Sequence, residues 1–218
     1  MKALLRAALE LLLPSVCASC GRQAPLGPLC GACALPPAGA LGPPPRAIAA
    51  WHAAIAYDAA GADWVRRFKY PARGLRGLDP AAEAVAFGLV KRLAARVPGG
   101  APALVVPVPL HARRLRERGF SPAALLAKAC AREAHAPFAP VLLARLRDTP
   151  SQTGLSRGAR RRNVAGAFVA RAEAPPRVWL VDDVVTTGST LSEAARALRR
   201  AGACEVVGVC LAHRPLVG

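Results

Sequence analysis

The chain has 218 residues, of which 53% are apolar, so it is long enough to bury one sizeable core with a small appendage. Its 30 basic residues outnumber 13 acidic ones for a formal net charge of +17, which attracts phosphates and nucleic acid but specifies no fold. The apolar fraction excludes a chain that is too polar to form a core. Residues 66–76 and 113–162 together carry +14 of the charge, and they form either a solvated face or a surface that meets polyanions.

The first 16 residues predict a short amphipathic helix that ends at Pro14. Apolar residues at 3.6-residue spacing fall on one face of it: Leu4, Leu5, Ala8, Leu9, Leu12 and Leu13. The segment superficially resembles a signal peptide. However, Arg6 and Glu10 interrupt its apolar run, which is far shorter than the roughly 20 residues that span a bilayer. We therefore expect no membrane span and a cytoplasmic protein.

Four of the seven cysteines form two Cys-x2-Cys pairs with nine residues between them: Cys17, Cys20, Cys30 and Cys33. Each pair can direct two thiolates at one ion, so two pairs supply the four tetrahedral ligands of a structural zinc site. The alternatives are two disulfides in an exported protein, or a cluster that has lost its metal. Because a cytosolic chain favours metal over disulfides, we predict one structural Zn²⁺ in an N-terminal helix and zinc module of residues 1–36.

The remaining chain reads as a linker, 37–50, rich in proline and glycine, followed by a larger domain, 51–218. Residues 151–163 are polar, basic and contain glycine, which predicts a mobile loop. Apolar patterns predict strands and helices that alternate along the larger domain, and strands that are apolar throughout indicate a parallel sheet covered on both faces. The expected strands are 51–57, 104–108, 164–169, 178–181 and 205–212, and the expected helices are 63–69, 80–97, 121–134 and 189–200.

The strongest functional signal lies in the run Val178–Leu191. Four apolar residues predict a buried strand, and Asp182 and Asp183 follow it. Ligands of open parallel sheets bind beyond the carboxyl ends of the strands, so we expect this acid pair at a binding edge. The turn that comes next opens a helix, and its backbone amides and hydroxyl groups form a cradle for a phosphate. The cradle residues are Thr186, Thr187, Gly188, Ser189 and Thr190.

The acid pair indicates what accompanies the phosphate. Two carboxylates beside a phosphate cradle would repel the anion unless they bound a neighbouring group, and ribose hydroxyls can donate hydrogen bonds to them. The pattern therefore predicts a site for a sugar with a phosphate at one end. The alternative is a plain strand, turn and helix with an acidic turn and an N-cap. A Walker phosphate loop is excluded because no Gly-Lys-Ser/Thr sequence is present.

The same run resembles the motif with which type I phosphoribosyltransferases bind 5-phosphoribosyl-1-pyrophosphate (PRPP). Further segments resemble the ComF family of competence-associated proteins, for which the four-cysteine module is also typical. These segments are VVPVPLH at 105–111, RGF at 118–120, QT at 152–153 and RRNVAGAF at 161–168. The resemblance implies an α/β fold of the type I phosphoribosyltransferase kind, with a parallel sheet flanked by helices and a small N-terminal four-cysteine zinc module.

The resemblance also implies roles for individual residues. Asp182 and Asp183 would bind the ribose hydroxyls of PRPP, and 186–190 would hold its 5′-phosphate. Mg²⁺ would bind with PRPP, held mainly by the pyrophosphate and ribose oxygens. The pyrophosphate loop would comprise Val106, Pro107, Val108, Pro109, Leu110 and His111, and the flexible loop that closes over the ligand would include Gln152, Arg161 and Arg162.

Two hypotheses about function stand side by side. The first is an enzyme that transfers the phosphoribosyl group from PRPP to a nitrogen acceptor that the sequence does not identify. Arg161, Arg162 or Lys69 would then neutralise the leaving pyrophosphate. The second is a non-catalytic protein of DNA uptake with a regulatory PRPP-type site, which binds single-stranded DNA through its basic surface and works with other competence proteins.

Overall fold

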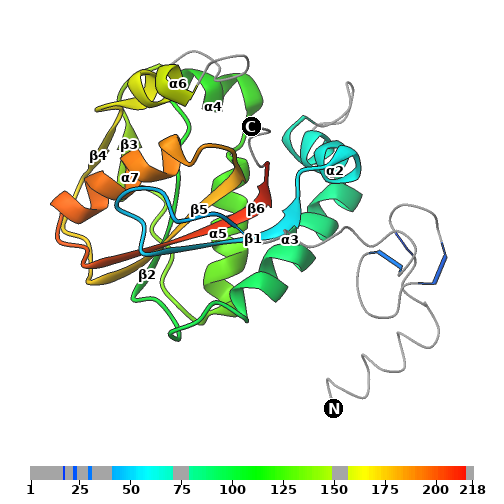
Figure 1. Ribbon diagram of the computed structural model, residues 1–218. Helices are drawn as coiled ribbons and strands as arrows, with labels where there is room; N and C mark the ends of the chain where they lie inside the picture. Colours follow the sequence, from blue (N-terminus) through cyan, green and yellow to red (C-terminus); the bar gives the residue numbers. More distant parts are fainter. Residues whose placement is uncertain are drawn as a thin grey trace.

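Strands and helices alternate along the part of the chain that the computed structural model describes, which is residues 17, 22–23, 29–30, 41–70, 79–148 and 157–214. A parallel sheet lies between two layers of other elements (Figure 1). This arrangement confirms the expected α/β fold with a parallel sheet flanked by helices. No helix within the described residues combines the length and the apolar character that crossing a bilayer needs.

Four parallel strands make up the main sheet, in the order β1-β6-β5-β2. The two central strands, β5 and β6, are almost wholly buried along their apolar stretches, as strands covered on both faces must be. In chain order the strands are β1 (Ala50–Ala56), β2 (Leu104–Pro107), β5 (Arg177–Val185) and β6 (Glu205–His213).

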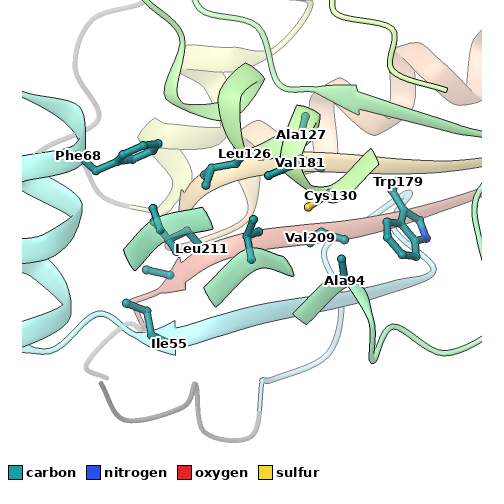
Figure 2. Packing of buried hydrophobic residues seen from close by; sticks show 14 of the residues in the cluster. Ile55, Phe68, Ala94, Leu126, Ala127, Cys130, Trp179, Val181, Val209 and Leu211 are labelled. Carbon is teal, nitrogen blue, oxygen red and sulfur yellow. The ribbon is translucent and has the colours of Figure 1, made fainter. Parts of the chain in front are cut away.

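Three helices, α2 (Ala59–Lys69), α3 (Pro80–Ala94) and α5 (Pro122–Glu133), cover one face of the sheet. Their apolar side chains pack against the side chains that the strands present to that face, where Phe68 and Leu126 lie near Val181 and Leu211 (Figure 2). Such dense apolar burial is the main favourable term in folding. It holds the end of α2 beside the end of β5.

The opposite face is covered by α7 (Ser189–Arg200) and by a two-stranded antiparallel ribbon of β3 (Leu143–Arg145) and β4 (Phe168–Ala170). Gly208 of β6 permits a close approach of α7, because a Cβ atom at that position would lie 2.6 Å from Cδ2 of Leu191. This contact places the first turn of α7, and with it the turn that precedes the helix, directly over the sheet.

Residues 41–49, which fall in the expected linker, lie against this second face. Ile48 is buried there, and the amide of Ala49 donates to the carbonyl of Val206 at 2.9 Å. The hydroxyl of Ser192 on α7 donates to the carbonyl of Arg46 at 2.7 Å. This segment is therefore fastened to α7, while the division of the chain into 1–36, 37–50 and 51–218 stays a prediction.

The structure corrects several expected elements. Residues 157–164, expected as loop and the start of a strand, form the helix α6 (Arg157–Val164), because arginine is a good helix former even without an apolar stripe. The strand expected at 164–169 is β4, which begins only at Phe168. A helix that the sequence analysis did not expect, α4 (Ala112–Arg118), is capped by His111 and ends at Gly119, whose φ is +81°.

Polar side chains cap the starts of three further helices, and one strand extends beyond its expected end. Ser121 caps α5, where its hydroxyl accepts a hydrogen bond from the amide of Ala124 at 3.3 Å and Pro122 follows it. Asp58 and Asp79 cap α2 and α3 through backbone amides in the same manner. The strand expected at 178–181 is longer than expected, since β5 continues through the acid pair to Val185.

Candidate functional site

The candidate site lies where β2 and β5 end at the same edge of the sheet. Pro107, the last residue of β2, pairs with Val181, and the amide of Val108 donates to the carbonyl of Val181 at 2.8 Å. From Asp182 onward β5 pairs only with β6, so its other side is open toward the segment that follows β2. Parallel topology thus places the acid pair beside the expected pyrophosphate loop, as the binding edge of an open sheet requires.

Lys69 at the end of α2 reaches the acid pair. Its Nζ atom lies 2.9 Å from Oδ1 of Asp183, and the exposed fractions of the two side chains are 21% and 13%. Both carboxylates also hold backbone amides, since Asp183 N donates to Asp182 Oδ1 at 2.8 Å and Val184 N donates to Asp183 Oδ1 at 2.6 Å. The pair is therefore fixed in orientation, and one of its charges is neutralised.

The electrostatics of the acid pair follow from its burial. Burial, and after it the charge of Asp183, raises the pKa of Asp182 to about 7, against the opposing influence of Lys69 and Arg145. For Lys69, burial lowers the pKa and the carboxylates of Asp183 and Asp182 raise it, with a net rise. Lys69 therefore stays charged at neutral pH, and Asp182 is the carboxyl that a bound proton or a hydroxyl donor would stabilise.

The expected phosphate cradle forms the turn between β5 and α7. Gly188 adopts the left-handed conformation with φ +68° and stands as the N-cap of α7, without a side-chain capping bond. The hydroxyls of Thr187 and Ser189 are 2.8 Å apart, and the amide of Ser189 donates to Thr187 Oγ1 at 3.3 Å. The positive end of the α7 dipole therefore faces a turn that carries hydroxyl groups, a suitable place for an anion.

The wall that follows β2 contains His111, which caps α4. Its Nδ1 atom accepts the amide of Arg113 at 3.4 Å and lies 3.5 Å from Oδ1 of Asp148, which also pairs with Arg113 at 3.2 Å. His111 thus has a structural task at the start of α4. These contacts hold the segment after β2 in one conformation next to the acid pair.

Three further residues converge on this edge from separate elements. Arg118, at the end of α4, lies over the ring of Tyr70 at 4.8 Å from the centroid and donates to its hydroxyl at 3.0 Å. Arg145, at the end of β3, lies over the ring of Phe168 at 5.4 Å. Arg145 is half-buried, and its charge lowers the pKa of Asp182. Sequence reasoning missed Tyr70 and Arg145, because nothing local distinguishes them from other surface residues.

A cavity of about 520 Å³ adjoins the phosphate turn on the side of α6. Arg162 of α6 lines it together with Thr187, Gly188 and Ser189. The buried Glu193 of α7 holds the end of α6 in place, since its carboxylate accepts the amide of Gly166 at 2.9 Å and pairs with Arg196 at 2.7 Å. Sequence reasoning also missed Glu193, although an acid on the apolar face of a helix is a signal for a buried partner.

The structure brings most of the expected site residues together at one edge. The acid pair, the turn 186–190 and the segment 106–111 meet there, and Arg162 borders the same turn. Gln152 and the side chain of Arg161 lie outside the described residues, as do Cys20 and Cys33. Among the described residues no group of three or more His, Cys, Asp or Glu side chains could hold a metal ion. The four-cysteine zinc site therefore stays a prediction.

Comparisons with known proteins agree with this architecture. Residues 121–216 match the family model described as phosphoribosyl transferase domain. Competence protein F of Haemophilus influenzae is 41% identical over 109 residues, which are 48% of this chain and 48% of that protein. DNA utilization protein YhgH of Escherichia coli strain K12 is 42% identical over 113 residues, 50% of this chain and 49% of that protein. The chain thus spans about half the length of the curated relatives it matches.

Solved structures show weaker similarity. The glutamine PRPP amidotransferase of B. subtilis, complexed with ADP and GMP, is 24% identical with a TM-score of 0.44, over 66% of this chain and 30% of that chain. Adenine phosphoribosyltransferase of Leishmania donovani is 17% identical with a TM-score of 0.34, over 72% of this chain and 80% of that chain.

Proposed function

We propose that this chain, which is similar to ComF-like phosphoribosyltransferase proteins, binds PRPP at the edge formed by β2 and β5. The observation that carries the proposal is the uninterrupted run from the buried strand through the acid pair to the turn that opens α7. In this assignment Asp182 and Asp183 bind the ribose hydroxyls and 186–190 holds the 5′-phosphate. The segment 106–111 faces the pyrophosphate, and the region Gln152–Arg162, whose second half belongs to α6, closes over it.

Lys69 reduces the negative charge of the site and so makes it suitable for an anionic ligand. Two bare carboxylates beside the phosphate turn would repel PRPP, but the ion pair with Lys69 removes one negative charge from that edge. Each hydrogen bond that a ribose hydroxyl then makes to a carboxylate contributes about 1.5–3 kcal/mol, because the acceptor is charged. Lys69 therefore supports the proposal that the acid pair serves a sugar and leaves the phosphates to the turn and the arginines.

Phosphoribosyl transfer would follow from this binding mode. A nitrogen lone pair attacks C1 of the ribose while the bond from C1 to the pyrophosphate oxygen breaks, and the pyrophosphate leaves with the bonding electrons. Bound Mg²⁺ would neutralise charge on that leaving group, and the ligand's own oxygens would provide most of its coordination, as Mg²⁺ prefers. Arg118, at the end of the helix that follows the segment 106–111, supplies fixed positive charge of the kind that would stabilise a leaving anion.

Calorimetric titration of PRPP with Mg²⁺ tests the binding proposal. Asp182→Asn and Asp183→Asn should each weaken binding at least tenfold, because each loses a charged acceptor for a ribose hydroxyl. Asp63→Asn is the matched control, since this acid sits on α2 in an exposed pair with Arg66 and should leave the affinity unchanged. Absence of PRPP binding by the unaltered protein would refute the proposal.

Catalysis needs its own test. Pyrophosphate release is measured from PRPP and Mg²⁺ in the presence of a panel of purines, pyrimidines and amines. Turnover with one acceptor supports the enzyme. Tight PRPP binding without turnover on the whole panel would contradict catalysis and favour a regulatory site.

A second candidate function, binding of single-stranded DNA, is favoured by the arginines of α4 and α6. These helices lie near one another above the candidate site (Figure 1), and their sequences are ARRLRER and RGARRRNV. The relatives named Competence protein F and DNA utilization protein favour a role that involves DNA. As part of this proposal, the protein acts in the cytoplasm together with other competence proteins. The affinity for a single strand should fall steeply as salt rises, because bound arginines displace counterions. No binding at low salt would exclude it.

The zinc module completes the proposal. Four thiolates from Cys17, Cys20, Cys30 and Cys33 would form a closed tetrahedral set, so the metal would be structural and would stabilise the segment that holds it. Elemental analysis should find one zinc per chain after purification without chelator. Zero zinc would end this part of the proposal.

A further inference from the structure

The cavity beside the phosphate turn is larger than a 5′-phosphate requires. Its volume of about 520 Å³ falls in the range of pockets that hold whole small molecules, roughly 300–1,000 Å³. One phosphate group has only five heavy atoms. The cavity borders Thr187, Gly188 and Ser189, but neither Asp182 nor Asp183 lines it. It therefore extends from the phosphate turn away from the proposed ribose position.

The walls of the cavity are basic. Among the described residues that line it, three are arginines, Arg46, Arg162 and Arg196, and one is an acid, Glu193. That acid is already satisfied, since it pairs with Arg196 at 2.7 Å and accepts the amide of Gly166 at 2.9 Å. Arg46 and Arg162 are exposed at the rim of the cavity. The cavity thus offers net positive charge next to the turn that is proposed to hold a phosphate, where arginine donors can bind the oxygens of a phosphate ester and the polar edges of a group attached to it.

Hydrogen bonds hold these walls in place without a ligand. Ser192 on α7 fastens the backbone of Arg46 at 2.7 Å, and Glu193 fastens the end of α6 through Gly166. Pro45 lies directly against the Cα atom of Gly188, so the segment that carries Arg46 is seated on the phosphate turn itself. A pocket built by three segments in this way is formed before its ligand binds, as small-molecule sites commonly are.

We propose that this cavity accepts a substituent on the 5′-phosphate, so that the site takes a ribonucleotide whose 5′-phosphate is a diester. The inference rests on the proposed function, because it uses the same acid pair and phosphate turn. An acid pair that binds both ribose hydroxyls excludes a nucleotide whose 3′-oxygen is esterified. Only the 3′-terminal nucleotide of an oligoribonucleotide has both free hydroxyls and a 5′-diester, and the preceding nucleotide would enter the arginine-lined cavity.

Calorimetric titration with four defined probes tests the inference. Ribose 5-phosphate and uridine 5′-monophosphate carry a monoester, the dinucleotide UpU carries the diester, and UpU with a 3′-terminal phosphate lacks the free 3′-hydroxyl. UpU should bind at least as tightly as the monophosphate, because its first nucleoside lies in the cavity. The 3′-phosphorylated dinucleotide should bind at least tenfold more weakly than UpU, because it cannot present two hydroxyls to the acid pair.

Substitution of Arg46 at the rim separates the cavity from the phosphate turn. The variant Arg46→Gln should bind UpU about tenfold more weakly, or about 1.4 kcal/mol, and the monophosphate less than threefold more weakly. The side chain is exposed, so folding should be unaffected. Arg171→Gln is the matched control, because this exposed arginine lies at a separate pocket between β4 and the end of α7.

The outcomes distinguish the inference from the proposed function. If the monophosphate or ribose 5-phosphate binds but UpU binds more weakly, the cavity does not accept a substituent and the inference fails while the proposed function stands. Equal losses for UpU and the monophosphate in the rim variant would likewise overturn it. If neither monoester binds, the proposed ribose phosphate site itself is wrong, and the inference falls with it.

Discussion

Removal of the Lys69 ammonium group should destabilise the protein through the acid pair. Lys69 Nζ lies 2.9 Å from Asp183 Oδ1, and both side chains are mostly buried, with exposed fractions of 21% and 13%. In Lys69→Met the apolar stem of the side chain is retained, but two neighbouring carboxylates lose their cation. Loss of one partner of a buried pair costs about 3–5 kcal/mol, because the other charge stays desolvated.

A control on the same helix isolates the effect of burial. Arg66 pairs with Asp63 at 2.7 Å, but the exposed fractions of these side chains are 73% and 47%. Arg66→Met should therefore cost no more than about 1 kcal/mol, since water already solvates both charges. The double variant Lys69→Met with Asp183→Asn should recover part of the loss of Lys69→Met, because no unpaired charge then remains at position 183.

Urea unfolding followed by tryptophan fluorescence measures these free energies. Trp64 of α2 and Trp179 of β5 are buried in the core and report on the same transition. Equal free energies of unfolding for Lys69→Met and Arg66→Met would refute the reasoning. The reasoning would also be refuted if the double variant lost as much as Lys69→Met and Asp183→Asn lose separately when added together, since the two side chains would then not be coupled.

Three further predictions concern the same edge of the sheet. The pKa of Asp182 is raised to about 7 in the folded protein, so the contribution of this carboxyl to stability falls as the pH rises from about 4 toward 7. In urea unfolding, Asp182→Asn should therefore stabilise the protein more at pH 8 than at pH 5, and an equal change in the free energy of unfolding at both pH values would contradict this. Gly188→Ala should lower the free energy of unfolding by at least about 1–2 kcal/mol, because φ is +68° and the new Cβ would overlap Pro45. It should also abolish PRPP binding in calorimetry, and unchanged binding would contradict the assignment of this turn to the phosphate. Gly208→Ala should lower the free energy of unfolding by about 1–3 kcal/mol, because its Cβ would lie 2.6 Å from Leu191. An unchanged free energy of unfolding in urea would show that α7 can shift without cost.

Parts of the fold follow from local patterns alone. The apolar run 178–181 and the amphipathic stretch 189–200 predicted a buried strand and a helix, and both are present as β5 and α7. The polar and basic stretch 157–163 was misjudged, because its helix carries no apolar period and is held by contacts with α7 instead. Periodicity detects elements that bury a stripe of side chains, and the sequence RGARRRNV contains no apolar repeat that it could detect.

The chemistry of the acid pair shows a different limit. Nothing near Asp183 in the chain indicates that its charge is neutralised, because Lys69 arrives from the end of α2 on another part of the sheet. Arg145 and Arg118 likewise come from the ends of β3 and α4. Arg46 reaches the phosphate turn only because the segment before β1 crosses the face of the sheet that α7 covers.

The sequence by itself determined the acid pair and the phosphate turn, since both lie in one continuous run whose geometry is set by a strand, a turn and the start of a helix. Only the tertiary structure decided which charges meet that run and that a basic cavity adjoins it. The physical reason is that parallel strands joined by crossover helices bring the ends of distant segments to one edge. Pairing across such an edge depends on the packing of the whole core, which no local pattern records.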